Sequence, residues 1–157
     1  MYYNVNMKIQ YRKINKNDKK ELLDMMRTFY SSNALYTNGS EEIFNSNFEN
    51  ALNNTQYLEC YFIVSLENVL GYVLLAKSYS TEFGRECIWL EDLYLKEQYR
   101  GKGIIPDFIS YIKNKYPDKI LRLEVEQENK GAIKAYQKSG FKNLPYLQYY
   151  YISNKNQ

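Results

Sequence analysis

The chain has 157 residues, of which 45% are hydrophobic and 25% are charged, and its net charge is +3 at pH 7. This is the size of one domain that can bury a core without disulfides, and the hydrophobic share argues against disorder. The mild positive charge allows an anionic ligand but falls short of the strongly basic footprint of a nucleic-acid-binding protein. We therefore expect a single domain over residues 1–157 without a nucleic-acid partner.

The residue types also limit the chemistry. The chain contains no histidine, which removes histidine-based triads and histidine-ligated metals. A general base must then be a carboxylate, a tyrosine, a lysine or a water that they hold. The two cysteines, Cys60 and Cys87, lie in apolar stretches without metal-type spacing. We expect reduced core thiols, with a disulfide or a nucleophile as the alternative, and no bound metal.

Residues 1–7 carry neither a basic segment nor an apolar one, so we expect no signal peptide. No apolar run approaches the roughly 20 residues of a membrane-spanning helix. These two features predict a cytoplasmic protein without a membrane partner.

The chain begins with a predicted strand and two predicted helices. Residues 8–13 alternate apolar and polar side chains, as a half-buried strand does. Asn15 or Asn17 can cap a helix whose apolar positions recur at helical spacing up to Tyr30. After a polar loop, Ser40 can cap a second amphipathic helix that has acids in its first turn.

The middle of the chain predicts three strands in succession. Residues 57–66 and 69–79 are rich in aromatic and β-branched side chains and flank a turn, which is typical of a hairpin. Residues 86–95 form the next predicted strand. It carries two adjacent acids, Glu91 and Asp92.

The last part predicts two more helices and two more strands. A helix over residues 104–116 precedes a strand over 119–125 that has one polar face. Residues 130–139 predict a helix that Gly140 ends, and the aromatic residues 146–152 predict the last strand. The order β-α-α-β-β-β-α-β-α-β predicts an α/β domain of the α+β type with a mixed sheet.

The turn Arg100-Gly101-Lys102-Gly103 is the most informative segment. Its glycines can take backbone angles that other residues avoid, and they let a ligand approach the main chain. A helix that begins after Gly103 points free N–H groups and its positive dipole end outward, and the two basic residues suit phosphate. Pro106 falls in the first turn of this helix, where its missing N–H costs nothing. We expect a phosphate-binding turn, with a plain solvated turn as the alternative.

Two other nucleotide motifs do not fit this turn. A P-loop needs a hydroxyl residue after its lysine, but Lys102 is followed by Gly103. A dinucleotide fingerprint needs a third glycine where Pro106 stands.

The turn and a second motif together resemble the Gcn5-related N-acetyltransferase family. The family's acetyl-coenzyme A signature, Gln/Arg-x-x-Gly-x-Gly/Ala, is matched over residues 98–103. Its second element, an Asn followed by an Ala and a Tyr on the next helical turns, is matched by Asn129, Ala132 and Tyr136. Residues 89–94 are most similar to the diamine (spermidine/spermine-type) acetyltransferases and their relatives that act on lysine-like amines. The resemblance implies the acyl-coenzyme A N-acyltransferase fold, with acetyl-coenzyme A (acetyl-CoA) as cosubstrate.

The resemblance also implies where the coenzyme binds. The pantetheine arm would run along the strand that ends at residue 95, and the pyrophosphate would sit on the glycine turn. Ile105 stands where many members have a small residue, which would shorten the pyrophosphate contact. The residues assigned to the coenzyme are Leu93, Tyr94, Leu95, Gln98, Arg100, Gly101, Lys102, Gly103, Ile104, Asn129, Ala132 and Tyr136.

Acetyl transfer to an amine needs a base, because an amine with a pKa near 10 is mostly protonated at pH 7. By resemblance, Glu91 matches the base of the diamine enzymes and takes the proton through water; we place it ahead of Asp92. The alternative is that both are solvated acids near a strand end. In a regular strand, adjacent residues point to opposite faces and cannot form a carboxylate pair, although a bulge would change this.

The departing thiolate needs a proton, and Tyr136 matches the family's general acid. A tyrosine stays protonated at pH 7 and can donate to a thiolate whose reference pKa is near 8.5. Ordinary packing is the alternative, since the chain has 18 tyrosines. We expect the oxyanion to meet a backbone N–H of residues 91–95.

The acceptor side is shaped in this family by the first two helices and their loop. This implies Tyr36, Glu41 and Glu42, besides Glu91 and Asp92, although a helix N-terminal role is stronger for Glu41 and Glu42.

The resemblance implies transfer to the primary amine of a small molecule, a polyamine or a lysine-like amine. The tyrosines of residues 146–151 suit packing first and a homodimer contact second. The alternatives are a protein N-terminal or lysine acetyltransferase, and a coenzyme A-binding sensor without turnover.

Overall fold

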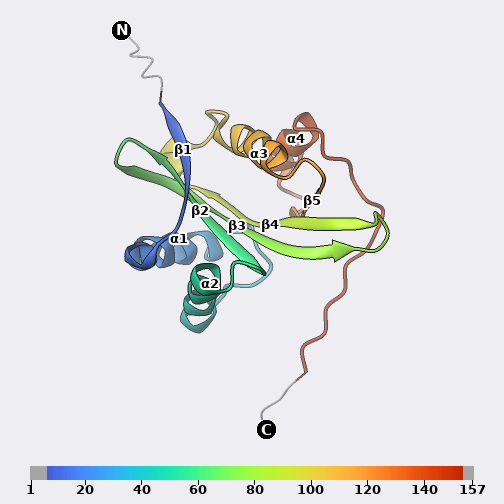
Figure 1. Cartoon of the computed structure of the whole chain (residues 1–157), viewed down its shortest axis with the longest axis horizontal. Coiled ribbons are helices and arrows are strands. Elements are labelled where there is room, and N and C mark those ends of the chain that lie inside the picture. Colours follow the sequence, from blue (N-terminus) through green and yellow to red (C-terminus); the bar gives the residue numbers. More distant parts are fainter. Residues whose placement is uncertain (1–6, 154–157) are drawn as a thin grey trace.

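A five-stranded sheet in the order β1-β2-β3-β4-β5 organises the chain (Figure 1). The computed structural model describes residues 7–153, so residues 1–6, where we expect no signal peptide, lie outside the described part. The first four strands pair antiparallel and the last two pair parallel. The strands are β1 (Ile9–Lys13), β2 (Leu58–Ser65), β3 (Asn68–Ser80), β4 (Arg85–Leu95) and β5 (Ile120–Leu123).

Helices cover both faces of this sheet. In Figure 1, α1 and α2 lie on one face, and α3 and α4 lie on the other. The mixed α/β fold expected from the order of elements is confirmed. The helices are α1 (Lys19–Tyr30), α2 (Glu41–Asn53), α3 (Ile104–Lys115) and α4 (Lys130–Lys138), with short 3-10 turns η1 (Lys16–Asp18) and η2 (Glu97–Tyr99).

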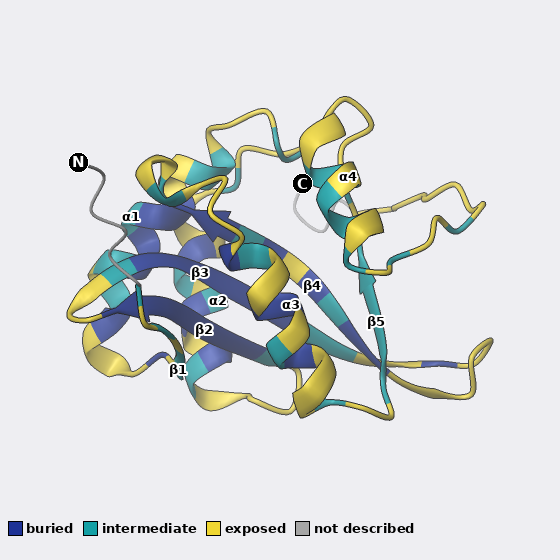
Figure 2. Ribbon diagram, turned by 90° about the horizontal axis from the view of Figure 1, so that it is seen from above, coloured by how far each residue is buried: buried dark blue, intermediate teal, exposed yellow. Residues whose placement is uncertain are grey.

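The apolar core is divided by the sheet into two clusters. Figure 2 shows that β2 and β3 are buried along most of their length, because they are central strands covered on both faces. The cluster on the α1/α2 face includes Phe62, Tyr72 and Tyr94. The cluster on the α3 face, which we call the α3 cluster, includes Leu90 and Phe108.

Two predicted helix starts can be compared with the structure. Ser40 caps α2 as expected, because its Oγ accepts a 3.2 Å hydrogen bond from the Ile43 N–H. Asn15, rather than Asn17, is the capping asparagine, and it caps the short turn η1 instead of α1. The regular helix α1 therefore begins later, after Asp18.

The predicted end of α4 is also confirmed. Gly140 has φ +89°, and its N–H donates to the Gln137 carbonyl at 3.0 Å. The next N–H, of Phe141, donates to the Tyr136 carbonyl at 3.0 Å. This is the left-handed glycine cap that ends many helices.

The strand predicted over residues 146–152 is wrong. These residues form no strand, and their large side chains are exposed, with Tyr149 and Tyr151 each at 88%. Aromatic residues favour strands only where a neighbouring strand offers a surface to pack on, and this segment has none. Its contacts are few, and they include the Tyr146 hydroxyl, which donates to Glu82 at 2.8 Å.

Both cysteines are buried and free, as expected of core thiols. Among residues 7–153, no helix is both long and apolar enough to cross a membrane.

Candidate active site

A β-bulge interrupts β4 at Glu91. Leu75 of β3 pairs with Leu90, but the preceding residue, Leu74, pairs with Asp92. Glu91 is therefore the extra residue that has no partner on β3. A bulge of this kind bends the strand and changes which way the following side chains point.

The bulge moves the second acid to the other face of the sheet. Before it, Ile88 and Leu90 pack in the α3 cluster, whereas after it Leu93 and Leu95 do so. The alternation has thus shifted by one residue, so Asp92 turns toward α1 and α2. The expectation of opposite faces for a regular strand does not apply here, because the strand is not regular.

Asp92 is buried at 3% exposure and accepts two tyrosine hydroxyls. The Tyr72 hydroxyl donates at 2.8 Å, and the Tyr30 hydroxyl donates at 3.1 Å. Burial raises the pKa of Asp92 to about 6, although both hydrogen bonds favour the ionised form. Asp92 is therefore mostly ionised at pH 7, but it takes up a proton far more readily than an exposed aspartate.

Glu91 lies at the surface beside this buried acid. Burial by its surroundings, then the charge of Glu124, then that of Asp92 raise the pKa of Glu91. The negative charge of Glu91 in turn contributes to the raised pKa of Tyr30, after the larger effects of burial and Asp92. Leu90 and Leu93, on either side of the two acids, both pack in the α3 cluster, so Glu91 and Asp92 both lie toward the opposite face of the sheet.

The strands β4 and β5 separate immediately after the residues that they share. β5 pairs only with residues 87–90 of β4, and its last residue, Leu123, faces Leu90. Figure 2 shows the two strands meeting at one end and separating toward α3 and α4. In the described chain, the backbone of residues 91–95 has no strand partner on this side. We call this the β4–β5 opening; it is bordered by Leu93, Tyr94 and Leu95.

The glycine turn adopts the conformation that the sequence predicts. Gly101 and Gly103 have φ values of +72° and +77°, and α3 begins at Ile104. Within residues 7–153, the backbone N–H groups of residues 101–105 make no hydrogen bond. A methyl group added at either glycine would meet no heavy atom within 4 Å. The turn is therefore an open cradle of unpaired N–H donors.

The basic side chains of this turn point in different directions. Arg100 folds back onto β4, where its Nε donates a 2.9 Å hydrogen bond to the Leu95 carbonyl. Lys102 lies over the ring of Tyr99, with its Nζ 5.7 Å from the centroid, and has no acidic partner in the described chain. Gln98 is exposed on η2. Lys102 is thus available to an anion that settles on the turn.

Ile105 does not project into this cradle. Its side chain is partly buried and packs against the α3 cluster, on the inner side of α3.

The second motif forms the start of α4. The Asn129 side chain accepts a 3.1 Å hydrogen bond from the Ala132 N–H and caps the helix. Tyr136 is partly buried, and it packs against the α3 cluster together with Leu93 and Leu123. Burial raises the pKa of the Tyr136 hydroxyl, which keeps it protonated at neutral pH.

The Tyr136 hydroxyl has no hydrogen-bond partner among the described residues, although every buried side-chain oxygen and nitrogen has one. The hydroxyl therefore reaches solvent, beside residues that line the β4–β5 opening.

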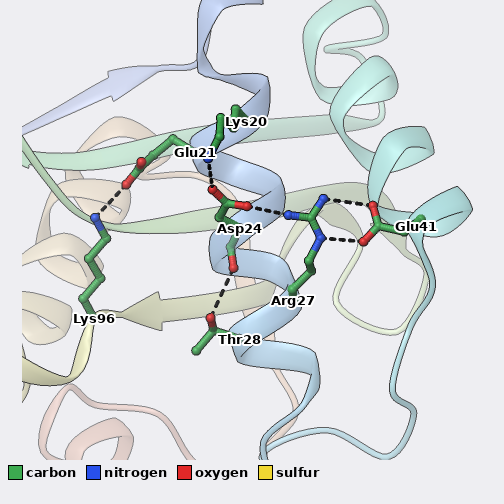
Figure 3. A network of polar contacts seen from close by, with 7 residues as sticks. All are labelled: Lys20, Glu21, Asp24, Arg27, Thr28, Glu41 and Lys96. Atoms are coloured by element: carbon green, nitrogen blue, oxygen red, sulfur yellow. Dashed lines mark hydrogen bonds and ion pairs between the residues drawn. The ribbon is translucent and has the colours of Figure 1, made fainter.

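The residues predicted for the acceptor side outside β4 lie at the start of α2 and in the loop before it. Glu41 is held by Arg27, whose Nε and Nη2 donate to it at 2.5 and 3.0 Å, and the same guanidinium also binds Asp24 (Figure 3). Tyr36 is 78% exposed in the loop between α1 and α2, and its ring lies 5.9 Å from that of Tyr150. The helix-terminal role expected of Glu41 is thus accompanied by an ion pair that the sequence did not indicate.

Three residues near the site were not identified from the sequence. Tyr30 and Tyr72 hold Asp92, and Glu124 adds charge beside Glu91. Nothing in the sequence distinguishes Tyr72 among 18 tyrosines, because its contact with Asp92 depends on the register of β3 and β4. Glu124 could have been identified from the sequence by placing the strand before the glycine turn beside the strand before Asn129, since the two strands are neighbours in the sheet.

A forked pair of parallel strands, next to an open helix N-terminus, defines a site for a long ligand that carries phosphate groups. Residues 21–141 match the acetyltransferase (GNAT) family, and the chain belongs to this family.

Known proteins resemble the chain in part or in fold. Thialysine N-epsilon-acetyltransferase from Bos taurus is 43% identical over 79 residues, which are 48% of this chain and 46% of that protein. The chain thus spans about half the length of this curated relative.

Solved structures share the fold, among them two from Clostridium species. One, a "possible acetyltransferase" from Clostridium difficile 630, has a TM-score of 0.78 at 19% identity and covers 92% of this chain and 97% of its own. The other, an acetyltransferase "with acetyl-CoA" from Clostridium acetobutylicum, has a TM-score of 0.69 at 16% identity, with coverages of 90% and 96%. At these identities, the likeness is one of fold.

Proposed function

We propose that this protein is an acetyl-CoA-dependent N-acetyltransferase that acts on the primary amine of a small molecule. The observation that carries this proposal is the bulge at Glu91, which sets an acid with a raised pKa at the β4–β5 opening. The family match supports acetyl transfer, and the likeness of half the chain to a thialysine enzyme supports a lysine-like amine as acceptor. A polyamine is the other acceptor that we propose.

The residues present fit coenzyme A. The unpaired N–H groups of residues 101–105 and the free Lys102 would hold its pyrophosphate, with Gln98, Arg100 and Ile104 beside them. The pantetheine arm is an extended amide chain, and the open edge of residues 93–95 offers it backbone partners. Asn129 and Ala132 would contact the coenzyme from the start of α4, besides their role in the cap.

Glu91 would act as the base, through a water molecule. Its carboxylate attracts the acceptor ammonium and takes one proton, which leaves a neutral amine to attack the thioester carbonyl. The C–N bond forms, and the oxyanion is stabilised by a backbone N–H along residues 91–95. The C–S bond then breaks as the nitrogen releases its second proton, which replaces the proton that Tyr136 gives to the departing thiolate. A carboxylate with a raised pKa suits this step, because a base whose pKa is closer to neutral pH accepts the ammonium proton more readily.

Tyr136 would protonate the departing thiolate. Its hydroxyl stays neutral because burial raises its pKa, and it reaches solvent beside residues of the β4–β5 opening. No metal takes part in either proton transfer.

The acceptor would enter from the α1/α2 face. Asp92, ionised at pH 7, provides a second negative charge next to Glu91 that would hold a cationic amine. Tyr36 and Glu41 lie on the helices and loop of this face and would border the acceptor.

The test is a thiol-release assay with acetyl-CoA and four classes of acceptor: polyamines, lysine analogues, aminoglycosides and peptides. We expect turnover with a polyamine or a lysine analogue and at least tenfold less with peptides. Faster turnover on peptides would assign a protein acetyltransferase. Binding of acetyl-CoA without thiol release on any amine would assign a sensor.

We also propose that the protein is a homodimer in the cytoplasm. The large apolar and aromatic side chains of the segment 146–152 are exposed, and a second copy would cover them. The two free, buried thiols suit a reducing compartment.

A further inference from the structure

Glu124 follows β5 directly, at the level where β5 stops pairing with β4. The last paired residues are Leu90 and Leu123, and the next residue on each strand is a glutamate, Glu91 or Glu124. Leu90 and Leu123 both pack in the α3 cluster. In an extended chain, the following side chain points to the opposite face, so Glu124 turns to the side on which the bulge places Glu91.

These two carboxylates are not neutralised by the protein. Neither belongs to an ion pair among the described residues. The guanidinium of Arg122, two residues before Glu124, lies over the Trp89 ring instead, with its Cζ 4.4 Å from the centroid.

Asp92 and the tyrosines that bind it are further titratable groups next to Glu91. They are Asp92 on β4, Tyr30 on α1 and Tyr72 on β3, and both hydroxyls are bonded to Asp92. None of these groups is basic, and the Arg122 guanidinium on β5 lies over the Trp89 ring.

We propose that Glu124 is a positioning residue whose negative charge, across the β4–β5 opening from Glu91, makes Glu91 a stronger base toward the acceptor ammonium. A like charge disfavours the ionised form of its neighbour and so increases the neighbour's affinity for a proton. Burial contributes most to the raised pKa of Glu91, and the charge of Glu124 comes next, ahead of that of Asp92. This inference rests on the proposed function, in which Glu91 is the base.

The test is the pH profile of kcat/KM for the best amine, between pH 5 and 9. The acid limb of this profile reports the base of the free enzyme. In Glu124→Gln, we expect the midpoint of the acid limb to move to lower pH by about half a pH unit or more. The KM for acetyl-CoA should not change. Glu124→Asp keeps the charge and should keep the wild-type limb. Glu126→Gln removes a charge from the same segment, at an exposed site two residues on, and should leave the limb in place.

An unmoved acid limb in Glu124→Gln, with full activity otherwise, overturns the role of Glu124 and leaves the proposed function intact. Loss of activity at every pH in this variant, while Glu91→Gln stays active, would make Glu124 itself the base and also overturns the proposal. A wild-type protein that acetylates no amine overturns the proposed function and this inference together. Because Glu124 is exposed, its variants should fold, and equal melting temperatures verify this.

Discussion

The Tyr72 hydroxyl donates a 2.8 Å hydrogen bond to Asp92, one residue beyond the bulge in β4. This bond ties the central strand β3 to the second acid of the candidate site. The bond requires Asp92 to face α1 and α2, which is the orientation that the bulge gives it. A buried hydrogen bond therefore holds Asp92, the residue next to Glu91, in place.

Tyr72→Phe should destabilise the protein by about 1–2 kcal/mol at pH 7, because it removes a hydrogen bond to a buried carboxylate. Asp92 already has a pKa of about 6, above its unfolded value of 3.8, so its ionisation lowers the stability as the pH rises from 3.8 to about 6, and this cost is fully present at pH 7. Losing the hydroxyl raises this pKa further. The loss in free energy of unfolding of the variant, relative to wild type, should therefore be smaller when urea unfolding is repeated at pH 5.

The matched control is Tyr111→Phe, since the Tyr111 hydroxyl makes no hydrogen bond among the described residues. A deficit in Tyr72→Phe that is the same at pH 5 and pH 7 would show that the hydroxyl does not act through the charge of Asp92.

Tyr136→Phe should lower kcat by about 100-fold, because the departing thiolate then lacks its proton donor. The dissociation constant of acetyl-CoA should change less than threefold, since the ring and its packing with Phe141 remain. Stopped-flow thiol release and isothermal titration calorimetry measure the two quantities. An unchanged kcat would remove the acid role of Tyr136.

Gly103→Ala should weaken acetyl-CoA binding at least tenfold. Its φ of +77° strains any other residue, and the added methyl would occupy the open cradle that the pyrophosphate needs. Gly84→Ala is the control, because Gly84 has a φ of +62° with equally open space but lies in the β3–β4 turn. Each should cost about 1–2 kcal/mol of stability. Equal affinity for acetyl-CoA in both variants would show that the turn does not bind the coenzyme.

Glu59→Gln tests a buried ion pair outside the site. Burial alone would raise the pKa of Glu59, but hydrogen bonds from Lys77, Tyr116 and Tyr61 outweigh it and hold the pKa at about 2. This group stabilises the fold above pH 4.5, and its contribution fades as the pH falls toward 2.

The Glu59→Gln variant should lose about 2–3 kcal/mol at pH 7, since it leaves the Lys77 charge without its partner. The difference in free energy of unfolding between the variant and wild type should be smaller in urea titrations at pH 3. A deficit that stays constant down to pH 3 would contradict the charge-based account.

The parts of the site that depend on local sequence could be predicted. The glycine turn, the start of α3 and the cap of α4 follow from residues within a few positions of each other, so their chemistry determines their conformation. Asn129 caps its own helix, and Gly140 ends it.

The parts that depend on strand register could not be predicted. The bulge at Glu91 is visible only when β4 is laid against β3, and the partner of Asp92 lies 20 residues away on that strand. The predicted last strand failed for a related reason, because residues 146–152 have strand-type side chains but no neighbouring strand to pair with.

The role of Glu91 as the base is tested most directly by comparing thiol release by wild type and Glu91→Gln from pH 7 to pH 9.5. At pH 7 the acceptor amine is charged, and loss of the base should slow kcat/KM by about 100-fold. Near pH 9.5 a large share of the amine is already neutral, so the defect should shrink at least tenfold. A Glu91→Gln variant whose rate equals that of wild type, or whose defect is the same at both pH values, would contradict this role.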